Sequence, residues 1–264
     1  TGNHLLPRLE KGDYHVDTEE VDITDVNQVE DRILQIKPDY IINLAAISFV
    51  PDGEDESIYA VNTFGPQNIL SACLKLPKPP KNIILASSAN IYGLQDKEQV
   101  NEDCKPNPIN HYGCSKWSME QIAQTYSSDL NITITRPFNY TGVGQQSKFI
   151  VPKIVEHFKQ KSSTLQLGNI DVWRDFSDVR WIAEAYTKLL SSPIHGLSIV
   201  NLCSGNLICI REVIDTLQKI TGNKLNIEID DALVRQADIK RQCGNNNKIF
   251  MIIDLDNPKS TMAI

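Results

Sequence analysis

The sequence predicts an α/β protein with a doubly wound parallel sheet and a second, smaller α/β domain that covers the substrate. Short apolar runs ending in small or polar residues alternate along the chain with segments of helical period. Runs that are apolar throughout suit strands buried on both faces. Strands that alternate with helices indicate βαβ units, whose right-handed crossovers bring the carboxyl ends of the strands to one edge. Ligands bind at that edge, so the residues that close each strand are the candidates for chemistry.

Eight segments carry this pattern, taken in chain order. Apolar residues recur at helical spacing in 26–36, as Val29, Ile33 and Ile36, and again in 112–126, as Met119 and Ile122. The remaining predicted helices are 179–190 and 210–220. The predicted strands are the apolar runs 38–46, 82–88, 131–136 and 197–202.

The pattern loosens after Asn139, where glycine-containing loops appear. We therefore expect a first domain over 1–139, to which 170–205 partly return, and a smaller domain over 140–169 and 206–264. The opening residues Thr1-Gly2 run directly into Asn3-His4, without a first strand. A phosphate-cradling turn needs several glycines, so the first strand and the glycine loop are expected to be incomplete in this chain.

Composition narrows the function classes. The 264 residues are 41% hydrophobic and 22% charged, which excludes a disordered chain, a collagen and a coiled coil. No apolar run is long enough to cross a membrane. The net charge of −7 without a basic block gives no support for nucleic-acid binding. Six cysteines without a CxxC pair indicate reduced thiols, so we expect a cytoplasmic protein without a metal site or secretory signal.

The strongest local signal is Tyr112-Gly113-Cys114-Ser115-Lys116. A Tyr and a Lys four residues apart share one face of a helix. A nearby ammonium favours the phenolate, so we expect Lys116 to lower the pKa of Tyr112 and make it a usable general acid or base. A surface tyrosine–lysine pair is the alternative.

Three further features strengthen the catalytic interpretation. Ser88 follows a predicted strand and can donate a hydrogen bond to a substrate oxygen. Asn62 lies in an amphipathic segment and can order the site. Asn43-Leu44-Ala45-Ala46 ends a strand in small residues, which leaves room for a flat cofactor. A serine turn, a helix-face asparagine and a packed strand end are the alternatives.

These motifs, together with Ser87-Ser88-Ala89-Asn90-Ile91-Tyr92-Gly93 and Arg136-Pro137-Phe138-Asn139, resemble the extended short-chain dehydrogenase/reductase family. The resemblance to these nucleotide-sugar epimerases, dehydratases and reductases runs from residue 1 to about residue 249. It implies a Rossmann domain, NAD or NADP as cofactor, and a nucleotide-sugar substrate. It also implies a homodimer formed through the helices in 61–76 and 115–127.

The resemblance carries roles over to this chain residue by residue. Tyr112 is implied as proton donor or acceptor, Lys116 as the group that holds the nicotinamide ribose, and Ser88 as the partner of the sugar oxygen. The other implied cofactor residues are Thr1, Gly2, Asp22, Ile23, Leu44, Ala45, Ala46, Asn62 and Pro137. The other implied substrate residues are Asn139, Phe149, Lys153, Arg174, Arg235 and Asp238. For Arg174 a surface ion pair with Asp175 or Asp178 is the alternative, and for Arg235 a solvated loop charge.

Asn90 separates the members of the family. In the 4,6-dehydratases a Glu stands at this position and removes the C5 proton, whereas an amide cannot accept a proton at neutral pH. The stretch Phe138-Asn139-Tyr140-Thr141-Gly142 resembles the GDP-6-deoxy-4-keto-mannose reductases. A ketoreductase of a GDP-linked sugar is therefore expected. A C4 epimerase, a dehydratase that uses another carboxylate, and a silent dinucleotide-sensing protein are the alternatives.

Overall fold

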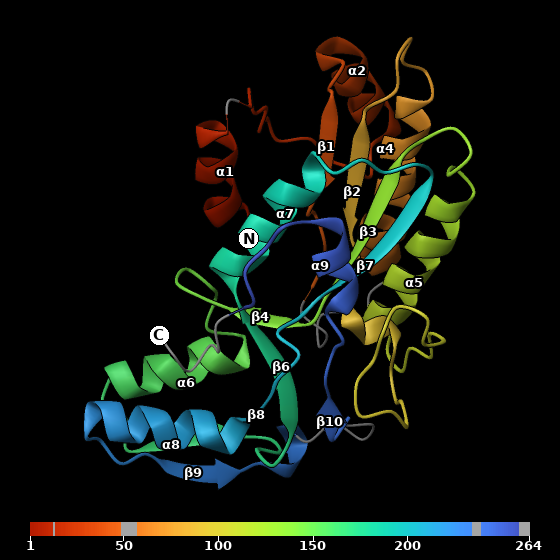
Figure 1. Cartoon of the computed structure of the whole chain (residues 1–264). Helices are drawn as coiled ribbons and strands as arrows, with labels where there is room; N and C mark the ends of the chain where they lie inside the picture. Colours follow the sequence, from red (N-terminus) through yellow and green to blue (C-terminus); the bar gives the residue numbers. More distant parts are fainter. Residues whose placement is uncertain (13, 49–56, 234–238, 259–264) are drawn as a thin grey trace.

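The computed structural model describes residues 1–12, 14–48, 57–233 and 239–258 (Figure 1). Four parallel strands form the main sheet in the order β1-β2-β3-β7. They are β1 (Tyr40–Asn43), β2 (Asn82–Ala86), β3 (Ile132–Pro137) and β7 (Leu197–Leu202). The four predicted strands and the α/β class are confirmed.

Helices cover both faces of this sheet (Figure 1). Ile83 and Leu85 of β2 pack against α2 (Val26–Ile36), α4 (Gly65–Cys73) and α5 (His111–Gln124). Ile84 between them points the other way, because successive strand side chains alternate. It packs with residues of α1 (Gly2–Lys11), α7 (Val179–Leu190) and α9 (Asn247–Ile252). β2 is therefore buried on both faces, as its apolar sequence predicts, whereas most of the edge strand β1 is only half-buried.

A smaller unit lies below the main sheet in Figure 1 and has a core of its own. Its sheet has the order β10-β6-β4, with parallel pairs, and β8 pairs antiparallel with β6. A parallel pair β5-β9 and two helices complete it. The bounds are β4 (Asn139–Thr141), α6 (Ile150–Lys159), β5 (Thr164–Leu167), β6 (Trp173–Asp178), β8 (Leu207–Cys209), α8 (Ile210–Thr221), β9 (Asn226–Ile229) and β10 (Arg241–Gln242).

Short helical turns connect these elements. They are α3 (Ser57–Tyr59), the π turn Ala60–Phe64, and the 3-10 turns Ala89–Ile91 and Asp231–Leu233. The predicted helices 26–36, 112–126, 179–190 and 210–220 correspond to α2, α5, α7 and α8. None of the helices in the described ranges is both long and apolar enough to span a bilayer.

The predicted domain division stays a prediction, and two segments bear on it. β6, within the returning segment 170–205, pairs with β4, β8 and β10 and not with the main sheet, whereas α7 and β7 do return to it. Ile249, Ile253 and Leu255, assigned from sequence to the smaller domain, pack in the core under α7. They share this core with Val200 and Leu202 of β7.

A buried ion pair joins the main sheet to α5. Arg136 at the end of β3 donates from Nη2 to Glu120 Oε2 at 2.6 Å, and the two side chains are 2% and 1% exposed. The Arg136 Nε group donates to Glu120 Oε1 at 3.1 Å, and the Ser87 hydroxyl donates to the same oxygen at 2.5 Å. Each of these two charges has lost its contact with water, and each is stabilised by the opposite charge of the other.

Removal of one partner tests this pair. We expect Glu120→Ala to lower the free energy of unfolding by about 3–5 kcal/mol, because it leaves the Arg136 guanidinium buried without a counter-charge. Urea denaturation followed by circular dichroism measures the change. The matched control is Glu184→Ala, which breaks a 3.6 Å ion pair with Lys188 on the surface of α7 and should cost less than about 1 kcal/mol. Equal losses in the two variants would contradict the expectation.

Candidate active site

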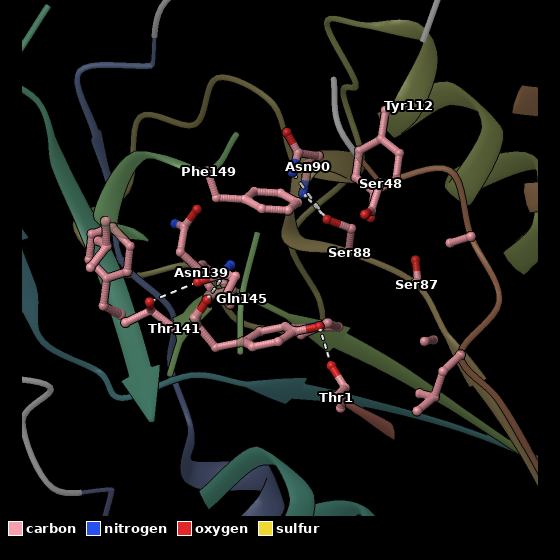
Figure 2. Close-up of a pocket in the computed structure, with 18 of the residues that line it drawn as sticks. Thr1, Ser48, Ser87, Ser88, Asn90, Tyr112, Asn139, Thr141, Gln145 and Phe149 are labelled. Carbon is pink, nitrogen blue, oxygen red and sulfur yellow. Dashed lines mark hydrogen bonds between the residues drawn. The ribbon is translucent and has the colours of Figure 1, made fainter. Parts of the chain in front are cut away.

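A cavity of about 430 Å³ lies beyond the carboxyl ends of β1, β2 and β3 (Figure 2). Leu44 and Ala46 follow β1, Ser87 and Ser88 follow β2, and Phe138 follows β3. The predicted edge is therefore hollowed at the place where the strands end. The cavity brings together eleven of the predicted site residues, namely Thr1, Gly2, Leu44, Ala46, Ser88, Asn90, Tyr112, Lys116, Pro137, Asn139 and Phe149.

Ser88 is held at the start of the 3-10 turn that follows β2. Its backbone is extended, with φ −163° and ψ 150°, and its side chain caps the turn. The Ser88 Oγ accepts from the backbone N–H of Asn90 at 3.2 Å and from its side-chain Nδ2 at 3.1 Å. Figure 2 shows both residues facing the cavity beside Tyr112.

Tyr112 lies in the first turn of α5, which begins with a side-chain cap. Asn110 Oδ1 accepts from Gly113 N at 2.8 Å. A Cβ at Gly113 would stand 2.7 Å from the backbone oxygen of Asn90, so the glycine lets the helix approach the turn that carries Ser88. Tyr112 is only 8% exposed, and this burial raises its pKa to about 12, while its hydrogen bond with Ser88 acts in the opposite direction.

The expected lowering of the Tyr112 pKa by Lys116 is wrong for this structure. The Lys116 ammonium donates to the backbone oxygen of Ala86, at the end of β2, at 2.7 Å. Burial lowers the pKa of Lys116 to about 8, and Glu120 one turn further along α5 opposes that shift. Loss of water around Tyr112 outweighs the other influences on its phenol. Tyr112 therefore keeps its proton at neutral pH.

The strand ends and the start of α1 fit a dinucleotide. Thr1 and Gly2, at the start of α1, line the cavity together with Lys116. Backbone amides at a helix N-terminus suit a pyrophosphate. The small Ala46 side chain lines the same cavity. These features and the position of Lys116 satisfy the requirements of NAD or NADP at this edge.

Asn62 and Ala45 act behind the cavity wall. Asn62 is fully buried in the π turn, where its Oδ1 accepts from Ile47 N at 2.9 Å and its Nδ2 donates to Ile47 O at 3.0 Å. The same amide donates to Ser115 Oγ at 3.2 Å. Ala45 N donates to the Asn43 side chain at 3.1 Å. Asn62 thus ties the segment after β1 to α5 without lining the cavity, and its predicted part in ordering the site stays a prediction.

The other predicted cofactor residues also lie outside the cavity. Asp22 accepts from the backbone and hydroxyl of Thr24, and Ile23 packs closely on Gly65 at the start of α4. Their predicted place along the adenine stays a prediction.

Several predicted substrate residues lie away from the cavity. Lys153 donates from Nζ to Gln166 O at 3.0 Å, and Arg174 on β6 donates from Nη1 to Trp173 O at 3.0 Å. Asp178, an alternative partner of Arg174, forms an ion pair with Arg180. The other alternative, Asp175, is buried and accepts bonds from the loop residues 204, 205 and 244. The predicted residues Arg235 and Asp238 fall outside the described part of the chain.

Tyrosines that the sequence analysis did not single out complete the cavity wall. Tyr140, on β4, shares a hydrogen bond of 2.8 Å with the hydroxyl of Thr1, and its proximity contributes to the raised pKa of Tyr112 (Figure 2). Tyr186 reaches the cavity from α7 and bonds to Thr135 at 2.9 Å. Tyr140 follows Asn139 directly, which is a signal in the sequence, whereas nothing in the sequence marks Tyr186. Within the described ranges no three metal-ligating side chains converge.

Comparison with known proteins identifies one matching family model and several similar proteins. A family model described as GDP-mannose 4,6 dehydratase matches residues 3–255. The GDP-6-deoxy-D-talose 4-dehydrogenase of Aggregatibacter actinomycetemcomitans is 34% identical over 238 residues, 90% of this chain and 81% of that protein. The GDP-6-deoxy-D-mannose reductase of Pseudomonas aeruginosa is 31% identical over 223 residues, which are 80% of this chain and 73% of that protein.

A solved structure is similar to this chain in fold. The RMD protein of Pseudomonas aeruginosa, in complex with NADPH, superposes with a TM-score of 0.86 at 27% identity. The match covers 99% of this chain and 91% of that chain.

The buried amine of Lys116 makes stability depend on pH. In the unfolded chain its pKa is the ordinary value, near 10.5, whereas in the folded protein it is about 8. Below about pH 8 the amine is charged in both the folded and the unfolded state, so the burial of its charge lowers the free energy of unfolding by its full amount. Between about pH 8 and 10.5 only the unfolded chain holds the proton, so wild-type stability rises relative to a variant without the amine.

We therefore expect any stability advantage of Lys116→Met over wild type at about pH 7.5 to shrink at about pH 10. Urea unfolding at the two pH values measures the difference. The exposed Lys97→Met variant is the matched control for loss of a positive charge. A difference between Lys116→Met and wild type that is the same at both pH values would contradict the burial argument.

Proposed function

Since the chain belongs to the GDP-mannose 4,6 dehydratase family of extended short-chain dehydrogenase/reductases, we propose that it reduces a nucleoside-diphosphate 4-keto-6-deoxy sugar with NADH or NADPH. The family comprises nucleotide-sugar epimerases, dehydratases and reductases. A GDP-linked hexose is the favoured substrate. One observation carries the proposal: Ser88, Tyr112 and Lys116 meet in one cavity whose described lining contains Asn90 but no carboxylate.

Reduction of a ketone needs a hydride at the carbon and a proton at the oxygen. The reduced nicotinamide supplies the hydride when it is bound. Tyr112, whose pKa is raised to about 12, holds its proton at neutral pH and donates it to the C4 oxygen. Ser88 donates a hydrogen bond to the same oxygen as negative charge develops there. Lys116, fixed on the end of β2, orients the ribose.

Dehydration makes a different demand on the site. Loss of water across C5 and C6 requires a base that takes the C5 proton, and Asn90 is an amide. No aspartate or glutamate is among the described residues that line the cavity. This supports reduction over 4,6-dehydration, although the family model takes its description from a dehydratase.

The alternatives differ in what they ask of Tyr112. A C4 epimerase begins by removing a proton from the sugar, which a phenol of raised pKa does poorly. A silent dinucleotide sensor needs no acid in its pocket, and here Ser88, Tyr112 and Lys116 are all in place. The two relatives act on GDP-linked 6-deoxy sugars named for talose and mannose, which differ in configuration at C4.

The nucleotide end of the substrate is assigned on family resemblance. Asn139 and Phe149 line the cavity and are proposed to contact the sugar and diphosphate. Arg174 on the neighbouring strand β6 is proposed to bind the diphosphate, for which a guanidinium is well suited. Lys153, Arg235 and Asp238 complete the proposed set.

We also propose a homodimer through α4 and α5, which lie side by side on one face of the sheet (Figure 1). Phe64 before α4 is 54% exposed and Leu74 after it is 49% exposed. These apolar side chains suit an interface between helices. Light scattering of the purified protein tests the proposal, and a monomer at micromolar concentration would contradict it.

Two parallel assays test the proposed reaction. We expect the protein to consume NADH or NADPH when given GDP-4-keto-6-deoxy-mannose, with the product identified by mass and NMR. We expect no loss of water from GDP-mannose, because C5 deprotonation without a base is slower by about 10²–10⁴-fold. Efficient dehydration would overturn the reductase proposal and require another base. Activity with neither sugar would favour the epimerase or the sensor.

Tyr112→Phe removes the proton donor and keeps the ring. We expect turnover of the keto sugar to fall by about 10²-fold or more while dinucleotide binding survives. Steady-state kinetics and calorimetry measure the two effects. The control is Tyr126→Phe, since Tyr126 bonds to Ser71 and does not line the cavity. Near-normal turnover would remove Tyr112 from the mechanism.

Arg174→Ala tests the diphosphate contact. We expect nucleotide-sugar binding to weaken by about 1.5–3 kcal/mol, the scale of a charge-assisted hydrogen bond, with little change for the free dinucleotide. Calorimetric titration with each ligand separates the two. An equal loss for both ligands would indicate damage to β6 instead.

A further inference from the structure

The hydrogen bonds of Ser88 restrict what its hydroxyl can do. Its oxygen accepts from the backbone N–H of Asn90 at 3.2 Å and from the Asn90 side-chain amide at 3.1 Å. A serine hydroxyl has two lone pairs and one proton. With both lone pairs occupied, Ser88 takes part in any further hydrogen bond as a donor.

The surroundings indicate where that proton points. Ser88 is 5% exposed, and its open side faces the cavity beside Tyr112 (Figure 2). Ser88 and Tyr112 share a side-chain hydrogen bond. Because both lone pairs of Ser88 are occupied, Ser88 is the donor in that bond. A direction of donation follows, from the Asn90 amide to Ser88 and from Ser88 to Tyr112.

We propose that Asn90 is a positioning residue, whose side-chain amide fixes the Ser88 hydroxyl as a donor, to the Tyr112 phenol in the free protein and to the substrate oxygen once the sugar is bound. The proposal rests on the reductase function proposed above and assigns Asn90 a part in it. With its oxygen accepting from Ser88, Tyr112 presents its own proton to the cavity. When the sugar oxygen takes the place of the phenol as the acceptor from Ser88, both Ser88 and Tyr112 donate to the oxygen that receives the proton.

The turn that carries Asn90 is itself fixed on several sides. The backbone oxygen of Ala89 accepts from Gln242 Nε2 at 3.1 Å, and that of Ile91 accepts from Asn107 N at 2.8 Å. Gly113 of α5 packs against the backbone oxygen of Asn90. Ala89 and Ile91 are buried. Because the turn is held in place, the direction of the hydrogen bond between side chain 90 and Ser88 depends on whether the side chain ends in a donor or an acceptor.

A carboxylate at this position would reverse the direction. Asn90→Asp has nearly the same shape but replaces the NH₂ donor with an acceptor, to which Ser88 would donate its proton. Ser88 would then no longer donate to Tyr112. Protonation of the new carboxyl restores a donor, so the defect should diminish as the pH falls.

Kinetics on the keto sugar test the proposal. We expect Asn90→Asp to lower kcat by about 10- to 100-fold with little change in KM, and its kcat relative to wild type to recover toward acidic pH. We expect the Asp substitution to have little further effect in a Ser88→Ala background, because Asn90 acts through Ser88. Exposed Asn27→Asp is the control for the added charge and should match wild type.

Wild-type kcat with an unchanged pH profile in Asn90→Asp would overturn the inference and leave the reductase proposal standing, as would additive effects of the two substitutions. If wild type does not reduce the keto sugar, the reductase proposal fails, and the free protein still tests the inference. The Asn90 side-chain amide signal in a ¹⁵N NMR spectrum, identified by its loss in Asn90→Asp, should shift upfield in Ser88→Ala. An unchanged signal would show that the amide does not donate to Ser88.

Discussion

The buried pair of Arg136 and Glu120 is the contact on which the geometry of the site depends. Arg136 ends β3, Glu120 lies in α5, and Ser87 at the end of β2 donates to the same carboxylate. Glu120 follows Lys116 by one helical turn and Tyr112 by two. The face of α5 that is held against the strand ends therefore carries the amine and the phenol with it. Neither charge can leave without exposing the other to an apolar interior.

Burial has opposite effects on the two reactive groups of α5. It raises the pKa of Tyr112 to about 12 and lowers that of Lys116 to about 8, because the neutral form of each is favoured away from water. The phenol consequently keeps its proton at neutral pH, and the amine loses its own proton more easily than an exposed lysine does. The same desolvation strengthens each hydrogen bond that these groups make with Ser88 and Ala86.

Sequence reasoning succeeded where a repeating pattern exists. Four apolar runs and four segments of helical period correspond to strands and helices, and the one-turn spacing of Tyr112 and Lys116 places both in the cavity. The strands of the smaller unit were not predicted, because strands such as β6, with the sequence Trp-Arg-Asp-Phe-Ser-Asp, and β10, with Arg-Gln, carry no apolar run. The pKa of Tyr112 was predicted in the wrong direction, since burial depends on elements that spacing does not reveal.

The sequence also did not reveal which of the candidate residues would line the cavity. Lys153 belongs to a motif that follows Phe149, yet its amine donates to the backbone oxygen of Gln166 on β5 and does not line the cavity. Tyr186 does line it, from a helix whose sequence shows only an amphipathic pattern. Which face of a helix meets a neighbouring strand end is decided by tertiary packing.

The order of strands in the main sheet has a consequence for how the protein is made. β3 lies between β2 and β7, but the whole of β4, α6, β5 and β6 is synthesised before β7. Until then Ile132 and Ile134 belong to an edge strand with an unpaired backbone and an apolar surface. A nascent chain stalled on the ribosome before Leu197 therefore presents a strand that can pair with another molecule, and folding waits for a distant partner.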